Sequence, residues 1–248
     1  MDTERGYAGT VGDLGDRRAQ KKAQTRAHVR SVAQGLFAEH GFDAVTISDI
    51  ARESAVAVQT VFNHFSTKEE LFFDGRAPWV HSPAQAVRDR APGVPPLTAL
   101  RDHLVAVVRG RFGALAAAGS RTDLRTIETS EALLAREREL VHESERLLVD
   151  ALYEAWTAEC PTDDGPVPHD PATAATLTAS TWLAALRSLI VGQRTRVHHG
   201  ACPREIAETL GQLAERLFDA MQAAVPELEQ RVGEVTLPQA ERFARRAC

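Results

Sequence analysis

The chain has 248 residues, of which 44% are hydrophobic and 25% charged, and its formal net charge at pH 7 is -5. This composition is typical of a globular protein, and the length allows a small domain beside a larger one. The sequence holds no unbroken apolar run of the roughly 20 residues that a membrane span needs, and its acidic, glycine-rich start differs from a signal peptide. We therefore expect a cytoplasmic protein with no membrane partner, whose scattered cysteines form no disulfide framework.

Basic residues are concentrated near the N-terminus, whereas acidic residues gather between Asp123 and Asp170. A basic run of this kind is either a solvated helix face or a surface that contacts a phosphate backbone. The motif that follows it favours backbone contact, above all by Arg17, Arg18 and Lys22. The whole run consists of Arg17, Arg18, Lys21, Lys22, Arg26 and Arg30, with no acidic residue among them.

The first part of the chain predicts a tail and one long helix. Residues 1–16 show no hydrophobic periodicity and are expected to be disordered. Apolar residues then recur at helical spacing from Ala19 to His40, where Gly41 ends the helix.

Three shorter helices are expected next. Thr46 and Asp49 have the spacing of a capping box, which predicts a second helix that ends near Ser54. A tight turn over residues 54–57 leads to a third helix at 58–65, and Ser66 and Thr67 are expected to cap a fourth. Short helices joined by a tight turn form a helix-turn-helix.

The third helix has the side chains of a DNA-reading helix. Such a helix lies in the major groove, shows short polar side chains to base edges, and packs its rear face on the preceding helices. Val61, Phe62 and Phe65 are expected to form the rear face. Amide side chains can pair bidentately with adenine, and a threonine can bind phosphate. The polar residues expected to face DNA are Gln59, Thr60, Asn63 and His64.

Lys68 is placed unusually, in the first turn of the expected fourth helix. A positive charge there opposes the helix dipole. A phosphate is attracted both by the lysine and by the free amides of the helix N-terminus. We therefore interpret Lys68 as a contact to DNA phosphate.

The segments TISDIA and VQTVFNHFSTKEELF, after a basic helix ending in LFAEHGFDAV, resemble the N-terminal domain of the TetR family of one-component repressors. The resemblance covers residues 22–76 and implies that an all-helical, dimeric, ligand-binding domain follows. It places Thr46 and Ser48 near the DNA backbone or a base. It matches Val58, Gln59 and Asn63 to base-facing positions, and it matches Thr60, Phe62, His64 and Lys68 to positions that usually contact phosphates.

The turn departs from the family pattern Gly-Val-Ser, because this chain has Ala55, Val56 and Ala57 there. An alanine in a left-handed turn conformation costs roughly 1 kcal/mol. The missing hydroxyl cap at Ala57 costs about another 1 kcal/mol. Phe62 stands where tyrosine is common in the family, so the hydroxyl that would meet a phosphate is missing.

Beyond the motif, prolines predict an irregular connector over residues 77–96. Apolar stripes at helical spacing then predict helices over 97–115, 134–156, 172–197 and 203–224. The fold class is therefore all-α. We expect a disordered tail (1–16), a helix-turn-helix DNA-binding domain (17–76), a larger helical bundle for ligand binding and dimerisation (77–225), and a C-terminal tail (226–248).

The helix at 172–197 is apolar around nearly its whole circumference, so it must be covered on more than one side. A second copy of the chain is the simplest cover, which predicts a homodimer. The residues expected at the dimer interface are Leu186, Ile190, Leu210, Leu213 and Leu217.

Aromatic and small residues on facing helices could either fill a core or leave a cavity for an effector. We predict a cavity, with one polar residue as an anchor for an anion or a carbonyl. Its expected lining is His103, Val108, Arg111, Phe112, Leu152, Tyr153, Trp156 and Trp182.

No metal and no cofactor are expected. His198, His199 and Cys202 could imitate a metal site, but adjacent histidines on a helix point about 100° apart, and cations are favoured at a helix end. The sequence also lacks a nucleophile elbow and a phosphate-binding glycine loop.

We therefore expect a non-enzymatic repressor that binds a palindromic operator in double-stranded DNA and is released by a small apolar or amphipathic effector. Two alternatives stay open at this point. One is control by a protein partner, and the other is a helical enzyme or carrier with a DNA-binding head.

Overall fold

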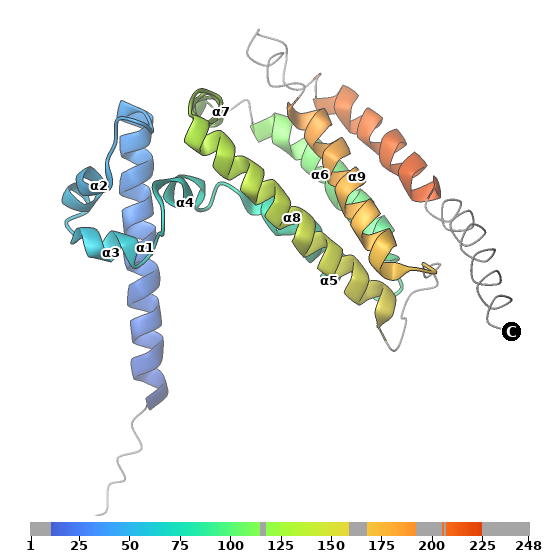
Figure 1. Cartoon of the computed structure of the whole chain (residues 1–248), viewed down its shortest axis with the longest axis horizontal. Helices are drawn as coiled ribbons and strands as arrows, with labels where there is room; N and C mark the ends of the chain where they lie inside the picture. Colours follow the sequence, from blue (N-terminus) through green and yellow to red (C-terminus); the bar gives the residue numbers. More distant parts are fainter. Residues whose placement is uncertain (1–10, 115–117, 159–167, 192–204, 206, 225–248) are drawn as a thin grey trace, which may run out of the picture. The chain divides into compact units, whose positions relative to one another are not determined.

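The computed structural model describes residues 11–114, 118–158, 168–191, 205 and 207–224 (Figure 1). Within these residues every regular element is a helix, which confirms the all-α prediction. The helices are α1 (Val11–His40), α2 (Ile47–Glu53), α3 (Val58–Phe62), α4 (Lys68–Phe73), the 3-10 helix η1 (Pro78–Val80), α5 (Ser82–Arg88), α6 (Pro96–Ala114), α7 (Ala118–Thr129), α8 (Glu131–Thr157), α9 (Pro171–Val191) and residues 207–224.

The chain divides into two compact units. The first comprises Met1–Ala77 together with Arg125–Arg136, and the second comprises the remaining residues. The sequence had assigned 125–136 to the C-terminal domain. Ile127 and Leu133 are buried, and the Ser130 hydroxyl lies 3.1 Å from Oδ1 of Asp43 in the loop between α1 and α2. These contacts explain why the end of α7 and the start of α8 group with the N-terminal unit.

Aromatic side chains form the core of the N-terminal unit. The rings of Phe37, Phe42 and Phe72 lie 5.2 to 5.9 Å apart in tilted and edge-on arrangements. Val61 and Phe65 are also buried and fix α3 to this core. Phe37 comes from α1, Phe42 from the following loop and Phe72 from α4, so the core joins helices that are distant in sequence.

Local capping follows the sequence closely in α2 and α4. Thr46 and Asp49 form the predicted capping box, with hydrogen bonds of 3.1 Å in both directions. The hydroxyl and amide of Thr46, followed by Arg52, hold the pKa of Asp49 at about 2. Thr67 caps α4 by accepting a hydrogen bond of 3.0 Å from the amide of Glu70.

Several helix bounds differ from the prediction. α1 begins at Val11, within the expected tail, and residues 1–10 lie outside the described part of the chain. α3 ends at Phe62 instead of Phe65. The connector contains η1 and α5 because Pro78 and Pro83 stand in the first turns of these helices, where proline loses no helical hydrogen bond.

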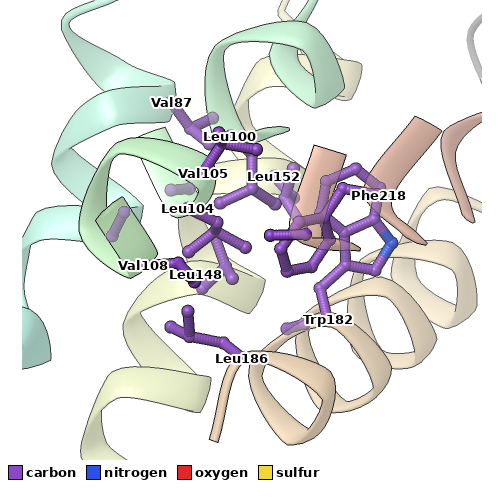
Figure 2. Close-up of a cluster of buried hydrophobic side chains, with 14 of the residues drawn as sticks. Val87, Leu100, Leu104, Val105, Val108, Leu148, Leu152, Trp182, Leu186 and Phe218 are labelled. Atoms are coloured by element: carbon purple, nitrogen blue, oxygen red, sulfur yellow. The ribbon is translucent and has the colours of Figure 1, made fainter. Parts of the chain in front are cut away.

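The C-terminal unit encloses one apolar core (Figure 2). Side chains from α5, α6, α8, α9 and the helix at 207–224 point into it. The rings of Trp182 and Phe218 lie 5.3 Å apart at its centre. α9 is apolar enough and long enough to cross a membrane by length and composition alone. Its core residues Trp182, Leu186 and Leu189 account for part of that composition.

Candidate nucleic-acid interface

α3 presents a row of side chains to solvent. Val58 is 40% exposed, and Gln59 and Asn63 are exposed beside it. The Gln59 amide nitrogen donates a hydrogen bond of 3.2 Å to the amide oxygen of Asn63. This bond lines up both amides on the same face of α3. Major-groove edges of adenine offer one donor and one acceptor, which an amide side chain matches.

Phe62 does not have the packing role that the sequence predicted. Its side chain is 47% exposed, whereas Val61 and Phe65 are buried beneath α3. The reason is helical geometry, since residue 62 lies about 100° around the helix from residue 61. Phe62 therefore joins the exposed surface of α3, and Thr60 is half-buried at its edge.

The predicted basic residues lie on α1, and Arg17, Arg18 and Lys22 are all exposed there. Thr46 and Ser48 are exposed at the N-terminus of α2. His64 is half-buried and follows α3. Burial, and then the positive charges of Lys22 and Arg26, lower the pKa of the His64 imidazole. The positive charges of α1 therefore act on the segment that directly follows α3.

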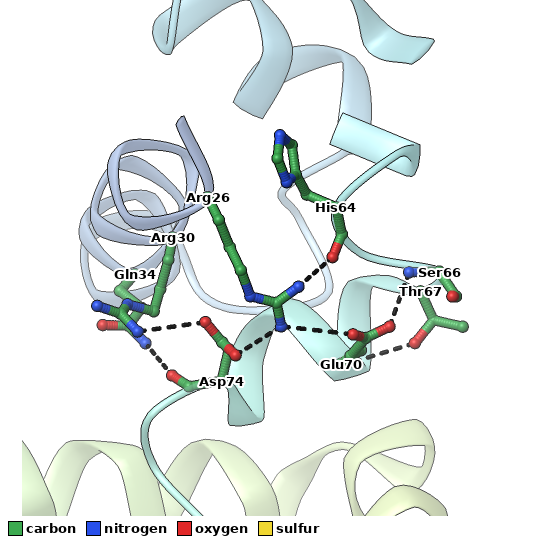
Figure 3. Close-up of polar contacts among 8 residues, drawn as sticks. All are labelled: Arg26, Arg30, Gln34, His64, Ser66, Thr67, Glu70 and Asp74. Carbon is green, nitrogen blue, oxygen red and sulfur yellow. Dashed lines mark hydrogen bonds and ion pairs between the residues drawn. The ribbon is translucent and has the colours of Figure 1, made fainter. Parts of the chain in front are cut away.

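Arg26 of α1 holds the segment that directly follows α3 in place (Figure 3). Its guanidinium donates to the carbonyl oxygen of His64 and lies 2.7 Å from Oδ1 of Asp74 and 3.5 Å from Oε1 of Glu70. The guanidinium also lies over the ring of Phe65, 4.1 Å from its centre. One side chain of α1 therefore contacts both the segment after α3 and the C-terminal end of α4.

Asp74 collects further contacts from α1. Its second carboxylate oxygen lies 3.3 Å from Nη1 of Arg30, and its carbonyl oxygen accepts a hydrogen bond of 3.1 Å from Gln34 (Figure 3). Gly75 follows with a φ of 74°, a left-handed conformation in which a side chain is strained. In the sequence, Arg26 and Arg30 are recognisable only as members of the basic run. Asp74 could have been noticed because it is a single acidic residue directly after two phenylalanines.

Lys68 has partners within the protein. Its Nζ donates to the carbonyl oxygens of Phe42 at 2.9 Å and Val45 at 3.0 Å, and lies 4.2 Å from the centre of the Phe42 ring. Lys68 therefore has partners for its charge before any DNA binds. Contact between Lys68 and a phosphate stays a prediction, and the structure supplies a second role in closing the loop between α1 and α2.

The residues expected around an effector cavity differ in their burial. Val108, Leu152, Trp156 and Trp182 are buried among the side chains of the C-terminal core, and Tyr153 is 46% exposed. Their contact with an effector stays a prediction.

The polar residues predicted for that cavity lie elsewhere. Nε2 of His103 lies 3.0 Å from the hydroxyl of Ser82, and burial lowers the pKa of His103. The side chains of Arg111 and Phe112 lie outside the described residues. The same holds for His198, His199 and Cys202. In the described part of the chain, no cluster of metal-ligating side chains is present.

The predicted dimer residues divide into two groups. Leu186 and Leu210 are buried in their own core, and Ile190 and Leu217 pack against it. Leu213 is 47% exposed. Leu186 and Leu210 therefore serve the core of their own chain, whereas Leu213 is exposed enough to meet another molecule.

Comparison with known proteins identifies the N-terminal motif. Residues 30–74 match the family model of bacterial regulatory proteins of the tetR family. Over 52 residues the chain is 36% identical to the mycofactocin biosynthesis transcriptional regulator MftR of Mycobacterium tuberculosis. That stretch is 21% of this chain and 26% of MftR, so the match spans about a quarter of the curated relative.

Two solved structures resemble this chain over most of their length. NalD, the secondary repressor of the MexAB-OprM multidrug efflux pump in Pseudomonas aeruginosa, is 21% identical, with a TM-score of 0.47 over 79% of this chain and 96% of NalD. SmeT, in its complex with triclosan, is 17% identical, with a TM-score of 0.49 over 80% of this chain and 91% of SmeT. The match to the tetR family model is therefore confined to the helix-turn-helix segment of this chain, residues 30–74.

Proposed function

We propose that this protein is a transcriptional repressor that binds a palindromic operator as a homodimer. The observation that carries the proposal is the exposed face of α3, where Val58, Gln59 and Asn63 project from a helix whose rear face is buried. A helix presented in this way can enter the major groove and read base edges. The match of residues 30–74 to the tetR family model supports the same function.

The residues divide into a reading set and a positioning set. Gln59 and Asn63 would read bases, and Val58 would contact a thymine methyl group. Backbone contacts would fix the register of the protein on DNA without reading its sequence. The proposed backbone contacts are Arg17, Arg18, Lys22, Thr46, Ser48, Thr60, Phe62, His64 and Lys68.

An uncharged, apolar stripe on α9 supports the proposed homodimer. Leu177 is 56% exposed and Val191 is 41% exposed, with exposed Ala184 and Ser188 between them. These residues recur at helical spacing and therefore lie on one face. A second copy of the chain would cover this face together with Leu213. Two half-sites one helical turn of DNA apart lie about 34 Å from centre to centre.

Control by a small apolar or amphipathic effector completes the proposal. The effector would bind the C-terminal unit of a dimer whose recognition helices do not fit the operator. An effector that binds this state better than the DNA-bound state weakens the operator complex by the ratio of the two affinities. A hollow in the C-terminal unit, which is not filled by the core residues named above, supports this part of the proposal.

The test is a mobility shift with DNA from the region upstream of the protein's own gene. Asn63→Ala should relax discrimination at one base pair of each half-site by about 1–3 kcal/mol. Lys22→Ala should weaken binding to all sequences alike. Arg216→Ala, an exposed change in the C-terminal unit, is the control and should leave binding unchanged. If Asn63→Ala and Lys22→Ala have the same effect on every sequence, the proposed division into reading and positioning is wrong.

A further inference from the structure

A hollow of about 120 Å³ opens between α8 and α9, where the core of the C-terminal unit ends. The Ser180 hydroxyl donates a hydrogen bond to Glu145, which places α8 and α9 side by side and antiparallel at this level (Figure 1). Beyond this pair, Val141 of α8 and Leu183 and Ile190 of α9 line the hollow. Leu186 belongs both to the core and to this lining. The hollow therefore continues the apolar core.

An aromatic side chain from outside these two helices forms a further wall. Ser144 is buried, and its hydroxyl donates to the carbonyl oxygen of Trp79 at 3.4 Å. This bond holds η1 against α8. The Trp79 indole is only half-buried and lines the hollow, so part of its surface is available to a ligand. Aromatic rings pack well against other flat rings.

Positive charge accompanies this apolar lining. Arg138 and Arg187 both line the hollow and are exposed, and neither has an ion-pair or hydrogen-bond partner within the described residues. Glu137 also lines the hollow and has an interaction of its own. Two guanidinium groups against one carboxylate leave the lining with a net positive charge. A guanidinium binds a carboxylate through two parallel hydrogen bonds.

We infer that this hollow binds a small carboxylic acid whose apolar body has the size of a single ring. An apolar cavity of about 150 Å³ holds one benzene molecule, so the present volume suits a body of about six carbon atoms. The ring would lie among Trp79, Leu183 and Ile190, and the carboxylate would face Arg138 and Arg187. The inference names the effector class for the proposed function and rests on that function for its regulatory meaning.

Isothermal titration of the full-length protein with benzoate tests the inference. Benzyl alcohol carries the same ring without a charge, and benzoate should bind about five-fold more tightly than benzyl alcohol. Benzylamine carries a positive charge at neutral pH and should bind more weakly still. Arg138→Gln and Arg187→Gln should each weaken benzoate binding by about two-fold without changing the binding of benzyl alcohol. Arg146→Gln is the matched control, because Arg146 is exposed on α8 but does not line the hollow.

Filling the hollow gives a second, independent readout. Val141→Phe and Leu183→Phe should each abolish benzoate binding in protein whose circular dichroism is unchanged. Equal binding of the three compounds, or binding unaffected by all four substitutions of lining residues, would overturn the inference. So would conversion of a dimer to a monomer by Leu183→Phe, because the hollow would then be part of an interface between copies.

A mobility shift with the same proteins separates this inference from the proposed function. If benzoate binds in the hollow and weakens the operator complex, both are supported. If benzoate binds there and operator affinity stays the same, the site stands and its regulatory role is overturned. If the protein without benzoate binds no operator, the proposed function fails, while the titration still decides the site.

Discussion

The side-chain amine of Lys68 lies 2.9 Å from the carbonyl oxygen of Phe42 and 4.2 Å from the centre of the ring of the same residue. It also donates to the carbonyl oxygen of Val45 at 3.0 Å. The positive charge that opposes the dipole of α4 is thus balanced by carbonyl dipoles and by an aromatic face. Lys68 therefore fastens the start of α4 to the loop between α1 and α2.

Lys68→Ala should lower the free energy of unfolding of the N-terminal unit by about 1–3 kcal/mol, because two charge-assisted hydrogen bonds and a cation-π contact are lost. Lys22→Ala should leave that free energy unchanged, since Lys22 is exposed on α1. Urea unfolding measures both. The slope of log affinity for operator against log salt separates the roles further. It should flatten by about 1–2 per dimer for each of the two changes, because both lysines are proposed to contact phosphate. An unchanged slope for Lys68→Ala would show that Lys68 holds the loop without contacting DNA.

The contact between Arg26 and Asp74 predicts coupling between stability and DNA binding. Asp74→Asn should destabilise the N-terminal unit by about 1–2 kcal/mol, because its carboxylate accepts from both Arg26 and Arg30. Arg26→Ala should also weaken operator binding, since the His64 carbonyl loses its donor and the segment after α3 loosens. A double-mutant cycle in urea isolates the pair. Additive effects of the two substitutions would show that the pair does not act as a unit.

The helix-turn-helix was predictable because its signals are local. Thr46 and Asp49 are three residues apart, and their capping box depends on nothing else in the chain. The end of α3 was less predictable, because Phe65 follows Val61 at helical spacing and continues the apolar pattern of the helix before it. Contacts from Arg26 on α1 determine how the chain continues after α3. Arg26 and His64 are 38 residues apart, so a local sequence pattern does not reveal their contact.

The helices of the C-terminal unit were predictable from the sequence, whereas its effector cavity stays a prediction. The spacing of Leu100, Leu104 and Val108 identifies one face of α6 in the sequence. Whether aromatic residues line a cavity or fill it depends on how closely the helices approach, which spacing does not reveal. Trp182 packs on Phe218 within the core of the C-terminal unit. The hollow at Trp79 and Val141 combines segments whose proximity exists only in the folded chain.

The turn between α2 and α3 leaves room for stabilising substitutions. Ala55 has a φ of 53°, and Ala57 caps α3 without a side-chain hydrogen bond. Ala55→Gly should stabilise the N-terminal unit by up to about 1 kcal/mol by relieving the left-handed strain. Ala57→Ser should add about 1 kcal/mol by supplying the missing acceptor at the start of α3. A higher urea midpoint at unchanged slope would confirm both, whereas a lower midpoint for Ala55→Gly would show that chain entropy outweighs strain.

Operator binding should depend on pH through His64. Burial and the charges of Lys22 and Arg26 lower the pKa of His64 in the free protein. A nearby phosphate would raise it, so binding would take up a proton and operator affinity would fall as pH rises through the pKa of the bound state. Each unit by which DNA binding raises the pKa of His64 corresponds to about a tenfold gain in operator affinity per site at low pH. Affinities measured from pH 5.5 to 8 should show this trend, and His64→Gln should remove it. An unchanged trend in His64→Gln would assign the effect to another group.

The exposed leucines predict the surface that joins two copies. Leu177 is 56% exposed and Leu213 is 47% exposed, so a charge at either position would leave the folded monomer largely intact but would be buried in a dimer. Leu177→Glu and Leu213→Glu should therefore give folded monomers in sedimentation velocity at micromolar concentration. Because two linked half-site contacts are replaced by one, operator affinity should fall by about 10²- to 10⁴-fold.

Two further variants separate dimerisation from folding. Gln212→Glu changes an exposed polar neighbour of Leu213 and should stay dimeric. Leu217→Glu places a charge against the core and should lower the free energy of unfolding by several kcal/mol, which sedimentation alone would not distinguish from loss of the dimer. If Leu177→Glu and Leu213→Glu both remain dimers that bind operator normally, the copies meet elsewhere. The exposed stripe on α9 would then need a different explanation from the one proposed for it.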